Sequence, residues 1–254
     1  MDRWIDLDGV VNMRDLGGLP TRDGGRIQAH RLIRSDNLQD LSRADVTRLI
    51  GLGVSDIVDL RSNTEVQVSG DGPLRATPLR HHHHSFFPEA RNDRAGAAAN
   101  DWRAGTHEMV KDASFWSQHY RGYLTGRPDS VTAALSVVAS AAGGTIVHCA
   151  AGKDRTGTVV GLALAVAGVP DEVIVEDYVL TSERLEAIMA RLIGRPPYAE
   201  SLAGRNHAEQ IPLAASMEAL LDFLADAGGA DGWLREQGWT ADEVDALQAK
   251  LLTP

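Results

Sequence analysis

Hydrophobic and polar residues along this chain follow two alternating patterns. Short, mostly apolar runs predict buried strands at residues 32–34, 54–59, 79–83 and 145–149. Between and after these runs, apolar residues recur at the spacing of a helical face. This spacing predicts helices that begin near residues 42, 114, 128, 156, 170, 182, 213 and 240. Strands that alternate with helices are typical of an α/β fold with a central, mostly parallel sheet.

Local start signals support three of these helices. Ser42 stands three residues before Asp45, and Thr240 stands three residues before Glu243, as in a capping box. Pro128 suits the first position of a helix, because the N–H that it lacks would have no partner there.

The size and composition of the chain limit its architecture. With 254 residues, 43% of them hydrophobic, the chain can bury a full core, and we expect one domain over residues 1–254. Gly, Pro and polar residues interrupt the pattern at 88–106 and at 194–212. We expect both segments to be mobile. Either is a candidate lid, and 194–212 is a lid or a connector.

The chain is acidic overall. It has 25 basic and 35 acidic residues, which give a formal net charge of −10. This balance argues against nucleic acid and against an anionic membrane surface as partners. No stretch is long and apolar enough to span a bilayer, so we expect no stable membrane insertion. Any affinity for an anion must therefore come from a local site.

The only cysteine, Cys149, lies between a predicted strand and a predicted helix. Residues 148–157 read His-Cys-Ala-Ala-Gly-Lys-Asp-Arg-Thr-Gly. A loop at this place collects unpaired backbone N–H groups at the positive end of a helix, which binds anions and favours the thiolate form of a cysteine. Gly152 permits close approach of the backbone, and the planar guanidinium of Arg155 can bind two phosphoryl oxygens at once. The loop therefore predicts a phosphate monoester site with Cys149 as the nucleophile.

Most residues of this run have an expected role in the site. Thr156 is placed to donate its hydroxyl to the sulfur of Cys149, and His148 is placed to brace the loop from behind through backbone hydrogen bonds. A buried structural cysteine is the alternative, but the other fixed positions of the run speak against it. The expected substrate-binding residues are Ala150, Ala151, Gly152, Lys153, Asp154 and Arg155.

The order His-Cys, five residues, Arg, Thr resembles the signature of the cysteine-dependent protein tyrosine phosphatases. The runs at 12–18, 31–38 and 57–62, together with Gly-Lys-Asp-Arg in the loop, are similar to an atypical bacterial and fungal branch. The actinobacterial secreted tyrosine and phosphoinositide phosphatases are the best-known form of this branch. The resemblance implies a central mixed, mostly parallel sheet flanked by helices, with C-terminal helices and a helical lid.

The same resemblance implies the reaction. A phosphomonoesterase of this type hydrolyses phosphotyrosine, and in some cases phosphoserine, phosphothreonine or phosphoinositide, through a phosphocysteine intermediate, here on Cys149. It needs no cofactor and no metal. The substrate is then a phosphorylated protein or a phosphoinositide, and the sequence does not decide between them or fix the oligomeric state.

The leaving alcohol must receive a proton, and a carboxylic acid is the usual donor. The Trp-Pro-Asp tripeptide that many phosphatases use for this purpose is absent. The Gly-Lys-Asp-Arg match implies Asp154 for this branch. Asp59 is the second candidate because it ends a predicted strand, where α/β active sites gather, and an ion pair with Arg61 is its equal alternative. Asp101 and Asp112 rank below these two.

Basic residues near the loop bear on substrate binding. Lys153 serves either a direct phosphate contact or a salt bridge to Asp154 or Asp59. Three arginines elsewhere either add positive charge or pair with nearby acids. These arginines are Arg14, Arg34 and Arg61, and the acids are Asp15, Asp36 and Glu65.

Four consecutive histidines, His81–His84, follow Thr77-Pro78-Leu79-Arg80. The run is typical of a strand that leaves the sheet toward the site, with alternate side chains on opposite faces. A metal tract is the alternative, but the expected reaction needs no metal.

Two other classes of function use similar parts. A phosphate-binding pseudophosphatase or interaction module normally lacks one of the catalytic groups, all of which are present here. A cysteine-loop sulfurtransferase or arsenate reductase is a further alternative, and the latter normally needs additional cysteines.

The start of the chain, residues 1–6, lacks the basic and apolar regions of a secretory signal. We therefore expect a cytoplasmic protein. The resembling family also includes proteins exported without a cleavable signal, so export remains an alternative.

Overall fold

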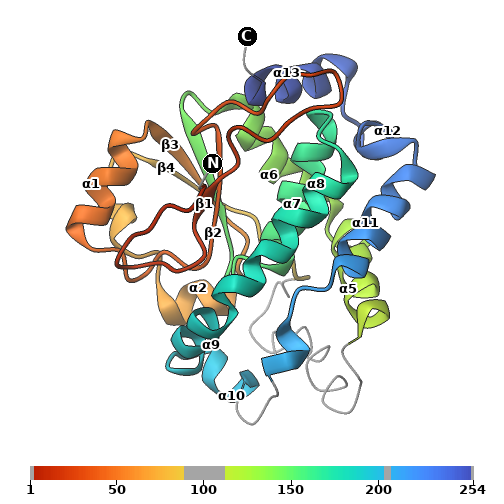
Figure 1. The fold of residues 1–254 in the computed structure, drawn as a ribbon. Helices are drawn as coiled ribbons and strands as arrows, with labels where there is room; N and C mark the ends of the chain where they lie inside the picture. Colours follow the sequence, from red (N-terminus) through yellow and green to blue (C-terminus); the bar gives the residue numbers. More distant parts are fainter. Residues whose placement is uncertain (1–2, 89–111, 203–206, 253–254) are drawn as a thin grey trace.

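The computed structural model describes residues 3–88, 112–202 and 207–252 (Figure 1). Asp101 and most of the segment 88–106 lie outside the described residues. None of the described helices has the length and hydrophobicity needed to cross a membrane.

A five-stranded sheet forms the centre of the described structure. The strands lie in the order β1-β2-β5-β3-β4, and only β1 runs antiparallel to its neighbour. The predicted α/β class with a mixed, mostly parallel sheet is thereby confirmed. The strands are β1 Arg14–Asp15, β2 Leu32–Ser35, β3 Val54–Asp59, β4 Arg80–His83 and β5 Gly144–His148.

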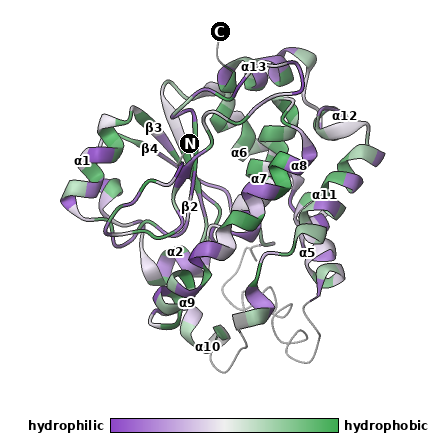
Figure 2. Cartoon of the chain, in the orientation of Figure 1, coloured by the Kyte–Doolittle hydropathy of each residue, from purple (hydrophilic) through white to green (hydrophobic). Residues whose placement is uncertain are grey.

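Helices cover both faces of the sheet (Figure 1). Figure 2 shows hydrophobic and hydrophilic residues alternating along α11 and α13, as expected for helices that turn one side to a core. The α-helices are α1 Arg43–Gly51, α2 Asn63–Ser69, α5 Ala113–Gly126, α6 Pro128–Ser140, α7 Asp154–Val166, α8 Asp171–Val179, α9 Leu185–Ile193, α10 Tyr198–Leu202, α11 Ala214–Asp226, α12 Gly229–Glu236 and α13 Ala241–Leu251. The 3₁₀ turns are η1 Pro73–Ala76, η2 Leu180–Arg184 and η3 His207–Gln210.

Alternation along the central strands supplies two cores. Val58 of β3 and Val147 of β5 belong to the larger core, which includes residues of α5, α6, α7 and α11. Their neighbours Ile57 and Ile146 belong to the smaller core on the side of α1 and η1. Successive residues of a strand point to opposite faces, so one apolar run serves both cores. The parallel strands β2, β5 and β3 end at the same edge, which places the loop after β5 there.

Some elements differ from the sequence prediction. Helix α7 begins at Asp154 rather than near residue 156, so Asp154 and Arg155 lie in its first turn. Helix α2 was not predicted because it has no apolar stripe, and a capping box of Ser62 and Glu65 defines its start. Helix α12 was not predicted because its glycines are typical of loops. One of them, Gly232, packs so tightly that an added Cβ would lie 1.9 Å from a carbonyl oxygen.

The histidine run forms the edge strand β4 and its extension. His81 pairs in register with Ile57, and His83 pairs with Asp59. The ring nitrogen Nε2 of His83 lies 2.7 Å from the carbonyl oxygen of Arg61. On the other face, His82 Nε2 lies 2.8 Å from a carboxylate oxygen of Asp56. These three histidines therefore make sheet and side-chain contacts on alternating faces.

Candidate active site

The loop Cys149–Lys153 connects the end of β5 to the start of α7. Gly152 has a positive φ of 67°, and an added Cβ would lie 2.5 Å from the backbone oxygen of Ser35. Only glycine combines this conformation with so close an approach. Cys149 is buried, with 2% of its surface exposed. The sequence therefore folds this segment into the strand, loop and helix start that was predicted.

The carbonyl groups of the loop are bound from outside. Asn37 donates to the oxygen of Ala150 from its backbone N–H at 3.1 Å, and from Nδ2 at 3.2 Å. Asn12 Nδ2 donates to Ala151 at 2.9 Å. Arg34 donates to the oxygen of Gly152 at 2.8 Å. The backbone N–H groups of residues 150–153 have no acceptor among the described residues, an arrangement that can bind an anion.

A buried ion cluster supports this arrangement from behind. Asp177 of α8 accepts from Arg3 at 2.7 Å and from Arg14 at 3.1 Å through one oxygen, and from Arg34 at 2.7 Å through the other. Burial alone would raise the pKa of Asp177, but these three cations lower it overall. Burial and the nearby Arg34 lower the pKa of Arg14 to about 9. Pairing with a neighbouring acid was one of two alternatives for Arg14 and Arg34, and both instead bind Asp177, which is distant in sequence.

Arg155 is fixed by a carboxylate that the sequence analysis did not assign to it. Glu65 of α2 binds the guanidinium with both oxygens, at 2.6 and 2.9 Å, and the pair is buried. Burial alone would lower the pKa of Arg155, but Glu65 raises it well above its usual value. The ring of Phe87 stands 5.2 Å from the guanidinium. The planar group is therefore held in one orientation beside Cys149.

Asp59 lies beneath the loop in a structural ion pair. Arg61 binds both of its oxygens, and His148 Nε2 lies 3.7 Å from Oδ2. Burial lowers the pKa of His148 to about 4, so this ring is neutral near pH 7. Arg61 is then the cation that keeps Asp59 ionised, and it lowers the pKa of Asp59 against the opposing effect of burial. His148 Nδ1 lies 3.3 Å from the oxygen of Cys149, as expected for a brace.

Asp154 lies at the first position of α7, in the same turn as Arg155. Its Oδ1 accepts a hydrogen bond from the Tyr120 hydroxyl at 2.7 Å and lies 3.3 Å from Lys153 Nζ. Burial alone would raise the pKa of Asp154, but Lys153 and Tyr120 lower it overall. Lys153 also stands 4.1 Å from the ring of Trp116. The salt bridge that the sequence analysis gave as one alternative for Lys153 is therefore formed.

One expected contact and one candidate acid have a different place in the structure. The Thr156 hydroxyl is buried and forms no hydrogen bond among the described residues, so the expected bond to the sulfur of Cys149 is not formed here. Asp112 caps α5 and accepts from the backbone N–H of Phe115 at 3.0 Å. This aspartate therefore has a structural role in the start of α5.

Helices α9 and α10 pack against the loop. Ala150 forms a small apolar cluster with Ile188 and Leu192 of α9 and with Tyr198 of α10. The Tyr198 hydroxyl interacts with Glu65, the partner of Arg155. The predicted lid segment 194–212 thus lies partly over the site, with residues 203–206 outside the described residues. Its mobility stays a prediction.

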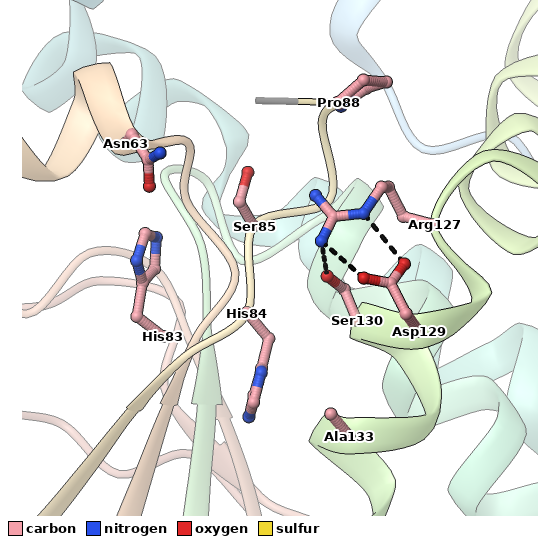
Figure 3. Close-up of a pocket in the computed structure, with 9 residues that line it drawn as sticks. All are labelled: Asn63, His83, His84, Ser85, Pro88, Arg127, Asp129, Ser130 and Ala133. Carbon is pink, nitrogen blue, oxygen red and sulfur yellow. Dashed lines mark hydrogen bonds and ion pairs between the residues drawn. The ribbon is translucent and has the colours of Figure 1, made fainter. Parts of the chain in front are cut away.

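A cavity of about 500 Å³ lies near the extension of β4 (Figure 3). Figure 3 shows Arg127 bonded to Asp129 and Ser130 on one side of this cavity, with Asn63 and His83 on the other. Arg127 also donates to the carbonyl oxygen of Phe87 at 2.6 Å. The cavity therefore adjoins the segment that carries Phe87, and none of its lining residues belongs to the cysteine loop.

Sequence reasoning missed several residues that complete the site. Asn12 lies in a run that carries the family resemblance, and Glu65 follows another such run by three residues. The capping-box spacing of Ser62 and Glu65 was an available signal. Asp177 and Tyr120 carry no local signal, because their partners are distant in sequence.

A cysteine beneath free backbone amides, beside an arginine held in a fixed plane, defines a cysteine-loop enzyme of phosphoryl transfer. A model of the tyrosine phosphatase family matches residues 5–253, and the chain belongs to this family. It is accordingly a phosphoric monoester hydrolase.

Two curated relatives are similar over most of the chain. The triple specificity protein phosphatase PtpB of Mycobacterium tuberculosis is 29% identical and covers 97% of this chain and 98% of its own. A putative tyrosine-protein phosphatase of Cupriavidus necator is 31% identical and covers 97% and 86%.

Among solved structures, TpbA of P. aeruginosa in complex with phosphotyrosine matches with 13% identity. The match covers 69% of this chain and 76% of that one, with a TM-score of 0.32. That likeness is too low to add to the family assignment.

Proposed function

We propose that this protein hydrolyses phosphotyrosine in proteins through a phosphocysteine intermediate on Cys149. Two observations together carry the proposal. The carbonyl oxygens of the loop accept hydrogen bonds from residues outside it, and Glu65 binds the Arg155 guanidinium with both oxygens. The loop presents amides to a phosphoryl dianion, and the guanidinium is held in the plane that two phosphoryl oxygens need.

The reaction then follows in two steps. The Cys149 thiolate attacks phosphorus, while the loop amides and Arg155 stabilise the charge on the equatorial oxygens. The ester bond breaks, and the leaving phenol takes a proton from Asp154. In the second step Asp154, now a carboxylate, takes a proton from water as its oxygen attacks phosphorus. The S–P bond breaks, the Cys149 thiolate leaves, and inorganic phosphate is released.

Asp154→Asn is expected to lower kcat by a factor of about 10² to 10⁴ and to remove the basic limb of its pH profile. Asp154 must be protonated for the first step, and its lowered pKa places the optimum on the acid side of neutrality. Asp59→Asn serves as the comparison, because both oxygens of Asp59 are bound by Arg61. It is expected to keep the basic limb. A pH profile of Asp154→Asn equal to that of wild type would reject Asp154 as the acid.

The surroundings of the loop support an aryl phosphate as the preferred substrate. Cys149 and Arg155 are buried, so an ester must reach down to them, and Phe87 and Trp116 add aromatic surface nearby. A phosphotyrosine side chain is long enough for such a site, and a phosphoserine side chain is shorter. Lys153 pairs with Asp154 and faces Trp116, but its Nζ forms no hydrogen bond among the described residues, so it can still donate to a phosphoryl oxygen of the ester.

A substrate panel tests the proposal. We expect kcat/KM for a phosphotyrosine peptide to exceed that for the matched phosphoserine peptide by about tenfold or more. Soluble phosphoinositides are expected to be weaker substrates than the phosphotyrosine peptide. Released phosphate is measured for each, with Cys149→Ser as the background. Equal or faster turnover of a phosphoinositide would contradict the proposed preference, and no turnover of any ester would contradict the function.

A further inference from the structure

A chain of two buried tyrosine hydroxyls leads to one oxygen of Asp154. Tyr120 of α5 donates to Oδ1 at 2.7 Å, and the hydroxyl of Tyr178 of α8 is hydrogen-bonded to that of Tyr120. The two tyrosines are only 0% and 1% exposed, so no water competes for these hydroxyls. Three elements, α5, α7 and α8, therefore meet at one carboxylate.

The direction of the hydrogen bonds follows from the number of protons. A tyrosine hydroxyl has one proton to donate, and Tyr120 donates it to Asp154. Tyr178 must then donate to the oxygen of Tyr120. A hydroxyl that accepts one hydrogen bond becomes a stronger donor in the next. Burial raises the pKa of both tyrosines, so both remain protonated donors.

The two oxygens of Asp154 are not equivalent. Tyr120 and Lys153 both contact Oδ1, whereas Oδ2 forms no hydrogen bond among the described residues. A donor at Oδ1 leaves Oδ2 as the oxygen that carries a proton. The pair Tyr120 and Tyr178, called the tyrosine dyad below, therefore fixes Oδ1 and leaves Oδ2 to transfer the proton.

Helix α8 holds Tyr178 at this place. Its ring packs against Gly157 of α7, where an added Cβ would lie 3.2 and 3.4 Å from two ring carbons. The preceding residue, Asp177, binds Arg34, which in turn donates to the oxygen of Gly152. Two consecutive residues of α8 therefore act on the site through one intermediate each. Asp177 reaches Gly152 through Arg34, and Tyr178 reaches Asp154 through Tyr120.

We propose that Tyr120 and Tyr178 are positioning residues that orient Asp154 and set its acidity. This inference rests on the proposed role of Asp154 as the general acid. The Oδ2–H bond breaks as the proton moves to the leaving oxygen, and the negative charge that forms on the carboxylate is stabilised at Oδ1 by Tyr120. The tyrosines keep their own protons throughout.

Other groups also face Asp154. Lys153 lies in the loop, and His119 and Tyr123 of α5 are close enough to interact electrostatically. The hydroxyl of Tyr123 is 2.7 Å from Nε2 of His119. It therefore belongs to a different hydrogen bond on the same helix, which makes Tyr123→Phe a matched control for Tyr120→Phe.

The experiment compares two aryl esters over a range of pH. Phenyl phosphate has a poor leaving group that needs an acid, and p-nitrophenyl phosphate has a good one that hardly does. Tyr120→Phe is expected to lower plateau kcat about tenfold for phenyl phosphate and less than about threefold for p-nitrophenyl phosphate. It is also expected to move the basic limb up by about one pH unit, because the carboxylate loses a hydrogen bond. Tyr178→Phe should act in the same direction with a smaller shift.

The outcomes separate this inference from the proposed function. Tyr123→Phe removes a hydroxyl that makes no hydrogen bond to Asp154, so it should move the basic limb less than Tyr120→Phe does. Far-ultraviolet circular dichroism and melting curves check that each variant folds, and Tyr178→Phe remains a test should Tyr120→Phe unfold. The wild type can be active while Tyr120→Phe and Tyr178→Phe both keep its basic limb and its ratio of kcat on the two esters. That result overturns this inference and leaves the proposed function standing. Equal losses on both esters also overturn it. A wild type that hydrolyses neither ester overturns the proposed function, and the inference with it.

Discussion

Cys149→Ser is expected to reduce turnover of a phosphotyrosine peptide to below about one ten-thousandth of the wild-type rate. A serine hydroxyl holds its proton far more tightly than a thiol, so no anionic nucleophile forms near neutral pH. Arg155, Glu65 and the loop amides are unchanged by the substitution. Binding of inorganic phosphate is therefore expected to stay close to that of wild type, and loss of chemistry is separated from loss of binding.

Three measurements check this result. Steady-state release of phosphate gives the turnover, rapid-quench analysis detects the phosphoenzyme, and calorimetric titration gives the affinity for inorganic phosphate. Cys149→Ala, which has no hydroxyl, sets the background of the assay. Turnover by Cys149→Ala above the uncatalysed rate, or a phosphoenzyme in Cys149→Ala, would place the nucleophile elsewhere, because alanine offers no atom that can accept the phosphoryl group. Wild-type protein that binds phosphate without turnover would instead be a pseudophosphatase.

The catalytic loop could be predicted because its parts are neighbours in sequence. A short apolar run before Cys149 and an apolar helix after it fix a strand and a helix, and the loop between them has few conformations available. Gly152 is the clearest case, since both its positive φ and its contact with Ser35 require glycine. The alternation of strands and helices predicts the α/β class and a mostly parallel sheet. It does not predict the order of the strands in that sheet.

The residues that hold the loop could not be predicted in the same way. Asn12 and Ala151 are 139 residues apart, and Arg14 and Asp177 are 163 apart, so no local pattern connects them. Of the two alternatives for Arg14 and Arg34, pairing with the nearest acid was wrong, because both bind Asp177. Adjacent residues of a strand point to opposite faces, so a sequence neighbour is rarely the partner.

Asp177→Asn is expected to lower the free energy of unfolding by about 3–5 kcal/mol at neutral pH. The carboxylate is 1% exposed and contacts Arg3, Arg14 and Arg34 at 3.1 Å or less. An amide of the same shape leaves three guanidinium groups without the anion that offsets their burial. The contact of Arg34 with the oxygen of Gly152 would then be the first loop contact to loosen.

The pH dependence of this effect has a definite sign. The pKa of Asp177 is lower in the folded protein than the value of about 3.9 expected in the unfolded chain. Its stabilising effect is therefore complete above the unfolded value and is lost as the pH falls toward the folded one. The difference between wild type and Asp177→Asn, measured by urea unfolding, should be constant from about pH 5 to 7 and shrink below about pH 4.

Asp171→Asn is the matched control, because Asp171 lies on the same helix and pairs with Arg22 at 2.7 Å in a contact that is more than half exposed, at 61% and 53%. Exposed pairs contribute at most about 1 kcal/mol, so this variant should unfold almost as wild type does. A loss in Asp177→Asn no greater than that of the control would mean that the cluster is not a structural support. A large loss that persists unchanged at low pH would mean that the support does not come from the charge of Asp177.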